Sequence, residues 1–579
     1  MVLDGPVELV VHGVVTALHA FTSSWGREWE PVDLDPAVAH VIGTASGRSS
    51  NGMVPLLIVE NSTGALAIAP RWSGSWRIQL DPGPSGLRIA VSIAPPGDGA
   101  VDAEGAVDAG GAVARKVHEE LPPVSLAWGA TGVDATAELA RLTATSTPRR
   151  APILTEWSHW WPYEDVEIDE VTFLAEADVA AGLGLEIAVL DAGWFGASSA
   201  DSSWHDQRGD WHLVNAARFP HGLAWLADQT RRRGLRFGIW IEAEALAAAS
   251  TTARDHPELM ARGGDRSDLG YVCLAAPAGR RFVTDAVSML IRTAGAGWLK
   301  WDFNLDPGLG CARGDHGHAP QDGLVGHYRA LYAIFDELRD AFPDTVVEAC
   351  SSGGLRVDAG MAEHVDAFFL SDPDWTEHAL QCLWGACQLL PPRQILHWMQ
   401  SEFRIHHRFQ KVDYSGSLLT VDTFDTSVRA ALLHRFGVSA RLTRMRPDLR
   451  ARLADHLALY RTVIRPLVDT GILRPLGDQP LREERGNRLP AFQLSGNGDD
   501  AGEHVIAAFR LPPAEEWEPV RPTGLDPDVR YRVQVLMSDV PSVVVGGAEL
   551  LADGIPLPDG SASSTLVRIT AEAHGRSVG

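Results

Sequence analysis

Chemically capable side chains recur at the ends of short apolar runs through the middle of this 579-residue chain. The residues at these ends are Trp157 and Trp160; Asp191 and Trp194; Trp240, Glu242 and Glu244; Lys300, Asp302 and Asn304; Cys350; Asp372; and Trp398. A polar residue at the end of one strand needs no special explanation, because strands emerge into water. Carboxylates and indoles at most strand ends suit an uncharged ligand rich in hydroxyl groups, because carboxylates accept hydrogen bonds and indoles stack on apolar ring faces.

Two of these carboxylates fit a division of labour between nucleophile and acid. In W-L-K-W-D-F-N the alternation places Lys300, Asp302 and Asn304 on one side of a strand, and an adjacent lysine favours an ionised aspartate. Asp372 follows an apolar run, and apolar surroundings raise the pKa of a carboxylic acid towards the value that a proton donor needs. A retaining glycosidase uses two such groups about 5–5.5 Å apart. A strand-end aspartate can also cap a helix or pair with lysine structurally, so the pattern alone leaves both interpretations open.

The elements that must position these residues alternate between strand and helix from residue 153 to residue 445. The apolar runs are I-L-T-E-W-S-H-W, L-E-I-A-V-L-D-A-G-W, R-F-G-I-W-I-E-A-E-A, G-W-L-K-W-D-F-N, T-V-V-E-A-C-S-S, D-A-F-F-L-S-D, I-L-H-W-M-Q-S and F-G-V-S-A-R-L. Amphipathic stretches such as Y-R-A-L-Y-A-I-F-D-E-L-R-D-A-F separate them. This order predicts a (β/α)8 TIM barrel, in which the carboxyl ends of all strands share one face.

Strand patterns flank the predicted barrel on both sides. V-E-L-V-V-H-G-V-V and P-L-L-I-V-E-N lie before it, A-F-Q-L-S-G and R-Y-R-V-Q-V-L-M after it, and turn residues separate the runs. The low-complexity stretch 100–114 predicts a flexible hairpin tip. We therefore expect a multidomain α/β protein with an N-terminal β-sandwich (1–150), a central catalytic barrel (151–480) and a C-terminal β-sandwich (481–579).

Charge and composition exclude several classes of partner. Fifty basic against 75 acidic residues give a formal charge of −25, which repels nucleic acid and acidic membranes. The first residues, M-V-L-D-G-P-V-E-L-V-V-H-G, lack the pattern of a secretory signal, and no apolar run is long enough to span a bilayer. Five cysteines without metal-finger spacing suit reduced thiols, so we expect a cytoplasmic protein. The oligomeric state stays open, with a homo-oligomer as one alternative.

One further segment has the composition of a metal site. C-A-R-G-D-H-G-H, residues 311–318, brings a cysteine, an aspartate and two histidines together. Without a second ligand cluster at fixed spacing, we interpret it as a loop on the substrate side and expect no metal and no cofactor.

Consecutive motifs then point to a family. V-L-D-A-G-W-F-G, R-F-G-I-W-I-E-A-E, W-L-K-W-D-F-N, E-A-C-S-S-G-G-L-R-V-D-A-G-M and L-S-D-P-D, with G-D-W-H-L-V-N-A-A-R-F-P-H-G-L (209–223) and W-S-G-S-W (72–76), resemble those of the α-galactosidases of glycoside hydrolase family 36, the melibiase-like clan. The resemblance covers nearly the whole chain. It implies the same three-domain architecture, a double-displacement mechanism with retention, a sugar substrate and no metal.

The resemblance also assigns residues by motif. It implies that Asp302 is the nucleophile and Asp372 the general acid/base. The positions that match its sugar-binding residues are Asp191, Trp240, Lys300, Cys350 and Gly353. We expect four neighbours of these motifs to contact substrate as well: Trp194, Asn304, Arg356 and Trp375.

The chain departs from the family pattern mainly in sugar recognition. Ala192 stands where a second aspartate usually holds the 4- and 6-hydroxyl groups of galactose, and each lost charged hydrogen bond costs about 1.5–3 kcal/mol. Asp206 or Glu242 could supply the missing carboxylate. Leu355 replaces a usual third glycine, and P-D-W-T-E-H follows Asp372 in place of D-T-D-A-I-E. The arginine that usually precedes the fourth helix has Arg266 as its nearest counterpart.

Three functions remain in competition. The first is hydrolysis of terminal α-galactosides or of a close relative, such as a β-L-arabinopyranoside or an α-N-acetylgalactosaminide. The second is galactosyl transfer, as in raffinose synthases. The third is carbohydrate binding without catalysis, against which the intact Asp302 and Asp372 argue. Outside the barrel, we expect Trp25, Trp29, Trp128 and Trp517 in the cores of the sandwiches.

Overall fold

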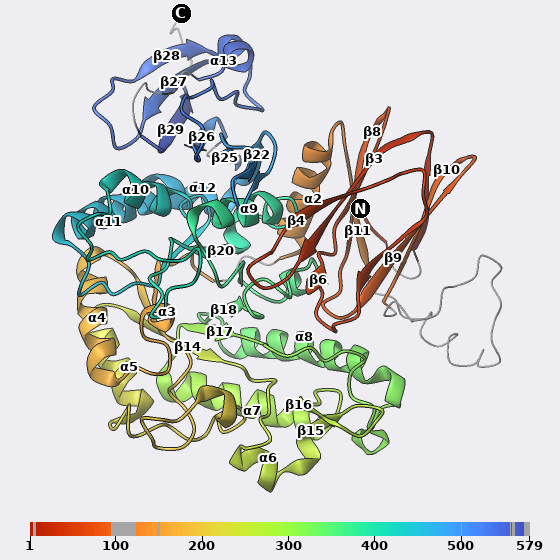
Figure 1. Cartoon of the computed structure of the whole chain (residues 1–579), viewed down its shortest axis with the longest axis vertical. Coiled ribbons are helices and arrows are strands. Elements are labelled where there is room, and N and C mark those ends of the chain that lie inside the picture. Colours follow the sequence, from red (N-terminus) through yellow and green to blue (C-terminus); the bar gives the residue numbers. More distant parts are fainter. Residues whose placement is uncertain are drawn as a thin grey trace, which may run out of the picture.

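The computed structural model describes residues 1–3, 7–93, 123–147, 151–498, 501–555, 557 and 562–572. Figure 1 shows a sheet-rich N-terminal region beside a barrel, with a C-terminal sheet above the barrel. The predicted hairpin tip at 100–114 lies outside the described residues. Within the described parts, none of the helices combines the length and the apolar character needed to cross a bilayer.

Eight parallel strands close into a barrel in their order along the chain, which confirms the predicted (β/α)8 fold. They are β12 (Glu156–Ser158), β13 (Ile187–Leu190), β14 (Arg236–Ile241), β17 (Trp298–Trp301), β18 (Val346–Ala349), β19 (Ala367–Phe369), β20 (Ile395–Trp398) and β21 (Arg435–Val438). Every strand coincides with one of the predicted apolar runs. Their carboxyl ends meet at one rim, where barrel enzymes build their sites.

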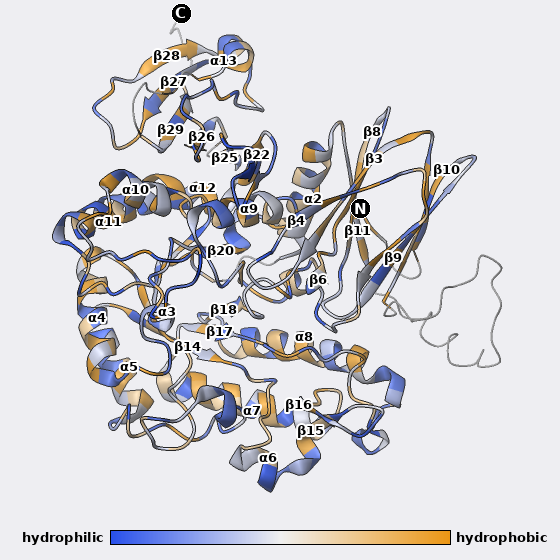
Figure 2. Cartoon of the chain, in the orientation of Figure 1, coloured by the Kyte–Doolittle hydropathy of each residue, from blue (hydrophilic) through white to orange (hydrophobic). Residues whose placement is uncertain are grey.

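Helices surround the strands, and the longer ones carry both hydrophobic and hydrophilic residues, as expected of helices that bury one side (Figure 2). They are α3 (Trp160–Tyr163), α4 (Glu170–Leu183), α5 (Gly222–Arg232), α6 (Thr251–Asp255), α7 (Pro277–Ala294), α8 (Gly323–Ala341), α9 (Thr376–Ala386), α10 (Val421–Arg429), α11 (Pro447–Leu459) and α12 (Arg465–Thr470). A hairpin of β15 (Met260–Arg262) and β16 (Asp268–Val272) lies between α6 and α7.

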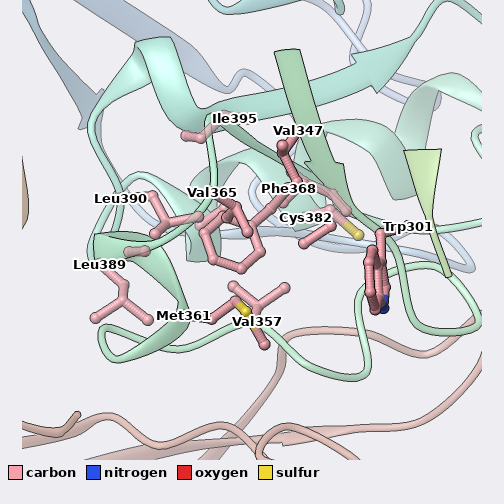
Figure 3. Packing of buried hydrophobic residues seen from close by; sticks show 14 of the residues in the cluster. Trp301, Val347, Val357, Met361, Val365, Phe368, Cys382, Leu389, Leu390 and Ile395 are labelled. Carbon is pink, nitrogen blue, oxygen red and sulfur yellow. The ribbon is translucent and has the colours of Figure 1, made fainter. Parts of the chain in front are cut away.

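Buried side chains fill the space between the strands and the helices. Figure 3 shows Trp301 of β17, Val347 of β18 and Phe368 of β19 with Cys382 of α9. All four are buried. The strands that carry the predicted catalytic residues are therefore fixed by packing on their outer side.

The N-terminal region contains two antiparallel sheets, one of seven strands and one of four. Its strands are β1 (Val2–Leu3), β2 (Val7–His12), β3 (Val15–Ser23), β4 (Glu30–Leu34), β5 (His40–Thr44), β6 (Gly52–Met53), β7 (Leu57–Asn61), β8 (Gly64–Pro70), β9 (Trp76–Gly83), β10 (Gly86–Ser92) and β11 (Val124–Gly129). Helix α2 (Gly132–Ser146), which the strand patterns do not predict, packs on β11 and β8. Thr131 caps it by accepting from the Asp134 amide.

The C-terminal region is built on one continuous antiparallel sheet of six strands. The strands are β22 (Ile472–Leu476), β25 (Ala491–Ser495), β26 (Glu503–Phe509), β27 (Arg530–Val535), β28 (Val543–Gly546) and β29 (Ser564–Ala571), with α13 (Gly547–Asp553) beside β28. Strand β22 starts before residue 481, the predicted boundary. The pair β23 (Pro480–Leu481) and β24 (Arg485–Gly486) forms a separate ribbon against α9.

Candidate active site

Asp302 directly follows β17, and its carboxylate accepts hydrogen bonds from several N–H groups. The backbone amide of Phe303 and Nδ2 of Asn304 each lie 2.8 Å from it, Nε1 of Trp240 lies at 3.2 Å and the amide of Ser352 at 3.3 Å. All four groups donate, so they stabilise negative charge on Asp302. Asp302 is 8% exposed, which leaves an edge of the carboxylate open to a ligand.

A second layer of contacts fixes the donors. Oδ1 of Asn304 accepts from the amide and the hydroxyl of Ser352, at 3.0 and 2.8 Å. Glu242 accepts from the Asn304 amide at 2.6 Å and pairs with Arg208 at 3.3 Å. Burial, with the charge of Asp302 adding to it, raises the pKa of Glu242 to about 7. Glu242 is thus a positioning group for the segment that holds Asp302.

Lys300 bonds to Asp191 rather than to its neighbour Asp302. Its ammonium donates to Asp191 at 3.0 Å and lies over the rings of Phe369 and Trp398, 4.6 and 4.5 Å from their centroids. Burial raises the pKa of Asp191, and the charge of Lys300 opposes this effect. That the adjacent Lys300 favours an ionised Asp302 stays a prediction, since the direct hydrogen-bond partner of its ammonium is Asp191. The groups that bond directly to Asp302 are the N–H donors described above.

Asp372 lies three residues beyond β19 and is half-buried. Nε1 of Trp25, from the N-terminal region, donates to its Oδ2 at 2.8 Å. Burial and then the charge of Asp302 raise the pKa of Asp372 to about 7, while the Trp25 bond opposes the shift. At neutral pH this carboxyl group can therefore hold a proton and deliver it, as a general acid must.

The loop after β18 contacts both aspartates. Ser352 donates to Asp302, and the next residue, Gly353, packs against the backbone of Asp372. Gly353 has φ of +73°, and a Cβ at this position would lie 2.6 Å from the Asp372 amide nitrogen. Cys350, at the start of the loop, is buried, and burial followed by the charge of Asp302 raises the pKa of its thiol. One loop thus sets the position of the two carboxyl groups relative to each other.

Trp375, one of the other residues predicted to contact substrate, lies among aromatic rings beside Asp372. Trp375 is nearly buried and stacks on His378 and Phe409. Its ring also faces His407, which lies edge-on to Trp25. These aromatic rings form one side of the surroundings of Asp372.

Trp194 and Arg356, by contrast, use their polar groups inside the protein. Nε1 of Trp194 donates to the carbonyl of Trp240 at 2.9 Å, and the side chain is fully buried. Both terminal nitrogens of Arg356 bond to Glu244, at 3.2 and 3.0 Å. These contacts correct the expected substrate role of the two residues: they hold Trp240 and the glycine-rich loop in place.

Asp206 and Glu242 are the two residues that could supply the carboxylate missing at Ala192. Ala192 is buried between Asp191 and the turn at Gly193. Asp206 is exposed, and Glu242 is fully buried and already engaged. Neither carboxylate stands in for the absent aspartate in this structure.

Two residues of the N-terminal region belong to the site although the motifs do not identify them. Trp25, expected in the sandwich core, is 45% exposed and bonds to Asp372. Trp128, another expected core residue, is also exposed. Arg48 donates to the carbonyl of Phe303 at 3.2 Å and to the hydroxyl of Ser352 at 3.0 Å. Trp25 stands among the turn residues S-S-W-G, which is a signal against a core position; Arg48 has no comparable signal.

Comparison with known proteins agrees with this geometry. The family model described as Melibiase matches residues 138–471, and the glycosyl hydrolase family 36 C-terminal domain matches residues 498–569. α-Galactosidase AgaA of Geobacillus stearothermophilus is 28% identical over 422 residues, which are 71% of this chain and 53% of that protein. α-Galactosidase C of Emericella nidulans is 28% identical over 406 residues, 67% of this chain and 49% of that protein. The chain spans about half the length of these relatives.

Solved structures show the same fold. The crystal structure of AgaA superposes with a TM-score of 0.80 at 22% identity, over 98% of this chain and 76% of that one. The α-galactosidase of Lactobacillus brevis gives a TM-score of 0.79 at 19% identity, over 99% of this chain and 78% of that one.

Proposed function

This chain belongs to the melibiase family, glycoside hydrolase family 36, and from that premise we propose that it is a retaining exo-glycosidase that releases a terminal α-galactosyl or closely related residue. The family predicted from the motifs is confirmed, because the family model spans more than half of the chain. The observation that carries the proposed activity is the pair of carboxyl groups on one rim. Asp302 is surrounded by donors, and Asp372 has a pKa of about 7.

The two groups suit the two steps of a double displacement. Asp302 attacks the anomeric carbon while Asp372 gives its proton to the leaving oxygen, so that a glycosyl ester forms and the aglycone departs neutral. Asp372, now ionised, takes a proton from water, which then opens the ester and frees Asp302. The structures of AgaA in complex with stachyose and raffinose support an oligosaccharide or glycoside as the substrate class here.

Replacing the nucleophile tests the reaction class. We expect Asp302→Ala to abolish hydrolysis of an activated aryl α-galactoside, and added azide to restore turnover by occupying the space of the lost carboxylate. Proton NMR of the unmodified enzyme should show the first product with retained anomeric configuration. A variant that keeps substantial activity without azide, or an inverted first product, contradicts the assignment. Adding an acceptor sugar and measuring transfer against hydrolysis separates a hydrolase from a galactosyl transferase.

Ala192 favours a second candidate substrate. A buried methyl group lies beside Asp191 where a carboxylate would accept from a galactose hydroxyl. A β-L-arabinopyranoside, which lacks the 6-hydroxymethyl group, leaves fewer hydroxyls without a partner at that edge. An α-N-acetylgalactosaminide is the other sugar variant to include in a substrate panel.

Restoring the carboxylate tests this preference. We expect Ala192→Asp to raise kcat/KM on α-galactoside relative to β-L-arabinopyranoside by about 10-fold or more, because one charged hydrogen bond contributes about 1.5–3 kcal/mol. Ala192→Asn, of similar size without the charge, is the matched control. If the ratio of the two kcat/KM values stays the same in both variants, Ala192 does not set the sugar preference.

A further inference from the structure

Four side chains with metal-ligating atoms meet beside the loop that follows β17. They are Cys273, Cys311, His316 and His318, and one ligand atom from each lies within 4.8 Å of all the others. Sγ of Cys273 is 3.3 Å from Nε2 of His318, and Sγ of Cys311 is 3.5 Å from Nδ1 of His316. In a tetrahedral zinc site, bonds of about 2.3 Å to sulfur and 2.0–2.1 Å to nitrogen separate sulfur from nitrogen by about 3.5 Å. The observed spacings are therefore those of a preformed ligand set.

The fold supplies what the local sequence lacks. Residues 311–318 contain only one cluster of ligands, and Cys273 comes from the end of the β15–β16 hairpin. We propose that Cys273, Cys311, His316 and His318 bind one zinc ion as a structural Cys2His2 site. The site has four protein ligands and no open position, which is typical of structural rather than catalytic zinc. It is separate from the two catalytic aspartates and does not depend on the proposed activity.

The surroundings of the histidines fit this use. Nδ1 of His318 lies 2.9 Å from the carbonyl of Ala319. A carbonyl only accepts, so Nδ1 carries the proton and Nε2 presents its lone pair towards Cys273, as in zinc sites whose histidines are oriented by a backbone carbonyl. His316 lies in the short turn Gly314–His316 and is nearly buried. Both cysteines are fully buried, so the site is closed to solvent on the sulfur side.

Two glycines hold the cysteine backbones in place. A Cβ at Gly279, in the first turn of α7, would lie 2.2 Å from the carbonyl oxygen of Cys273. A Cβ at Gly323, the first residue of α8, would lie 1.9 Å from the carbonyl oxygen of Cys311. The two helices thus pack directly on the cysteine backbones and fix the points from which both thiols extend.

The site joins the segment after β17 to the β15–β16 hairpin, where the Ala312 amide already donates to the Arg262 carbonyl at 2.7 Å. The segment between β17 and α8 runs from Asp302 to Asp322 without a strand. Its Phe303 packs with Tyr271 and with both cysteines in one small buried cluster. A zinc ion there connects this segment to the β15–β16 hairpin and steadies the loop that begins at the proposed nucleophile.

Metal analysis of the full-length protein tests the proposal directly. We expect protein produced with added zinc to retain about one ion per chain after dialysis. Cobalt exchanged into the site should give the visible absorption bands of tetrahedral cobalt with thiolate ligands. His318→Gln, at a partly exposed ligand, and Cys273→Ser should both lose the metal and the cobalt spectrum. Cys387→Ser, at a buried cysteine outside the cluster that donates to a backbone carbonyl, should keep them.

Three results overturn the proposal. The first is absence of zinc both from the purified protein and after reconstitution of the reduced protein. The second is a chain lighter by two hydrogens with a peptide linking Cys273 and Cys311, which would identify a disulfide instead. The third is retention of the cobalt spectrum in His318→Gln. The spectrum of the unmodified protein decides the matter if Cys273→Ser does not fold.

Discussion

At the scale of single residues, two aspartates on the same rim differ because their neighbours differ. Four N–H groups donate to Asp302, whereas one indole donates to Asp372. Burial has the largest effect on the pKa of Asp372 and raises it. A carboxylate that is stabilised as an anion can attack, and a carboxylic acid that keeps its proton can donate. The different environments, rather than the residue type, support the proposed roles of Asp302 as nucleophile and Asp372 as acid.

The pKa of Asp372 predicts how activity depends on pH. Asp372 must be protonated to assist departure of a poor leaving group, and it loses its proton as the pH rises through about 7. We expect kcat/KM on an unactivated oligosaccharide to fall over that range. An aryl substrate with a good leaving group should show a weaker fall, because its departure needs less proton transfer. Equal pH profiles for both substrates would contradict the general-acid role.

The hydrogen bond from Trp25 to Asp372 should affect the pH dependence of kcat/KM. This bond lowers the pKa of Asp372, so removing the bond should raise that pKa and move the falling limb to higher pH. Trp25→Phe keeps an aromatic ring and removes the donor. Trp128→Phe, at another exposed tryptophan of the same region, is the matched control and should leave the profile in place. A limb that stays put or moves to lower pH in Trp25→Phe would exclude Trp25 as a positioning residue for the acid.

At the scale of elements, the loop after β18 links the ends of β17 and β19, which carry the two proposed catalytic residues. The strand ends alone do not fix how Asp302 and Asp372 face each other, because β18 separates β17 from β19. Ser352 and Gly353 bridge this gap by contacting one aspartate each. Gly353 is needed twice, for its positive φ and for its lack of a side chain.

Gly353→Ala should therefore impair catalysis more than stability alone explains. The new Cβ would force the loop away from the Asp372 backbone, and a displacement of about 1 Å can cost on the order of 100-fold in rate. Gly222→Ala is matched in backbone strain, with φ of +76°, but its Cβ would meet nothing within 4 Å. Thermal unfolding should show a loss of about 1–2 kcal/mol from the left-handed conformation in both variants, and a further loss in Gly353→Ala from the contact with the Asp372 backbone. Equal kcat/KM values in the two variants would refute the bridging role of the loop.

The barrel could be predicted because each of its strands is a short apolar run with a polar end. This pattern depends only on residues that are adjacent in the sequence. The same pattern placed Asp302 and Asp372 at strand ends on one rim, which the structure shows. The bond from Lys300 to Asp191 and the bond from Arg356 to Glu244 could not be predicted. In each pair the partner follows a different strand, far away in the sequence. The role of Trp25 could not be predicted for the same reason, because its partner, Asp372, is far from it in the sequence.

At the scale of the whole molecule, the N-terminal region is part of the site rather than an attachment to it. Besides Trp25 and Arg48, Ser49 donates to Asp358 at 2.6 Å, and Asn51 donates to Asp306 at 2.7 Å. Arg48 is almost fully buried and pairs with the same Asp306 at 2.8 Å. These bonds connect the turn after β5 to the loops that hold both aspartates.

Removing Arg48 should loosen that connection. We expect Arg48→Met, which keeps the length of the side chain, to lower kcat/KM by about 10-fold or more, because the Phe303 carbonyl and the Ser352 hydroxyl lose charged hydrogen bonds of about 1.5–3 kcal/mol each. Arg88→Met removes an exposed pair with Glu8 on the same domain and should change little. Kinetics and thermal unfolding of both variants provide the comparison. Unchanged kinetics in Arg48→Met would show that the contact serves stability only.

Trapping the covalent intermediate tests the nucleophile most directly. A fluorinated glycosyl fluoride of the preferred sugar should react once per chain, because its ester forms readily and hydrolyses slowly. Peptide mass spectrometry should then find the sugar on Asp302 in W-L-K-W-D-F-N. A sugar attached to any other carboxylate, or an inverted product with no adduct, would contradict the account.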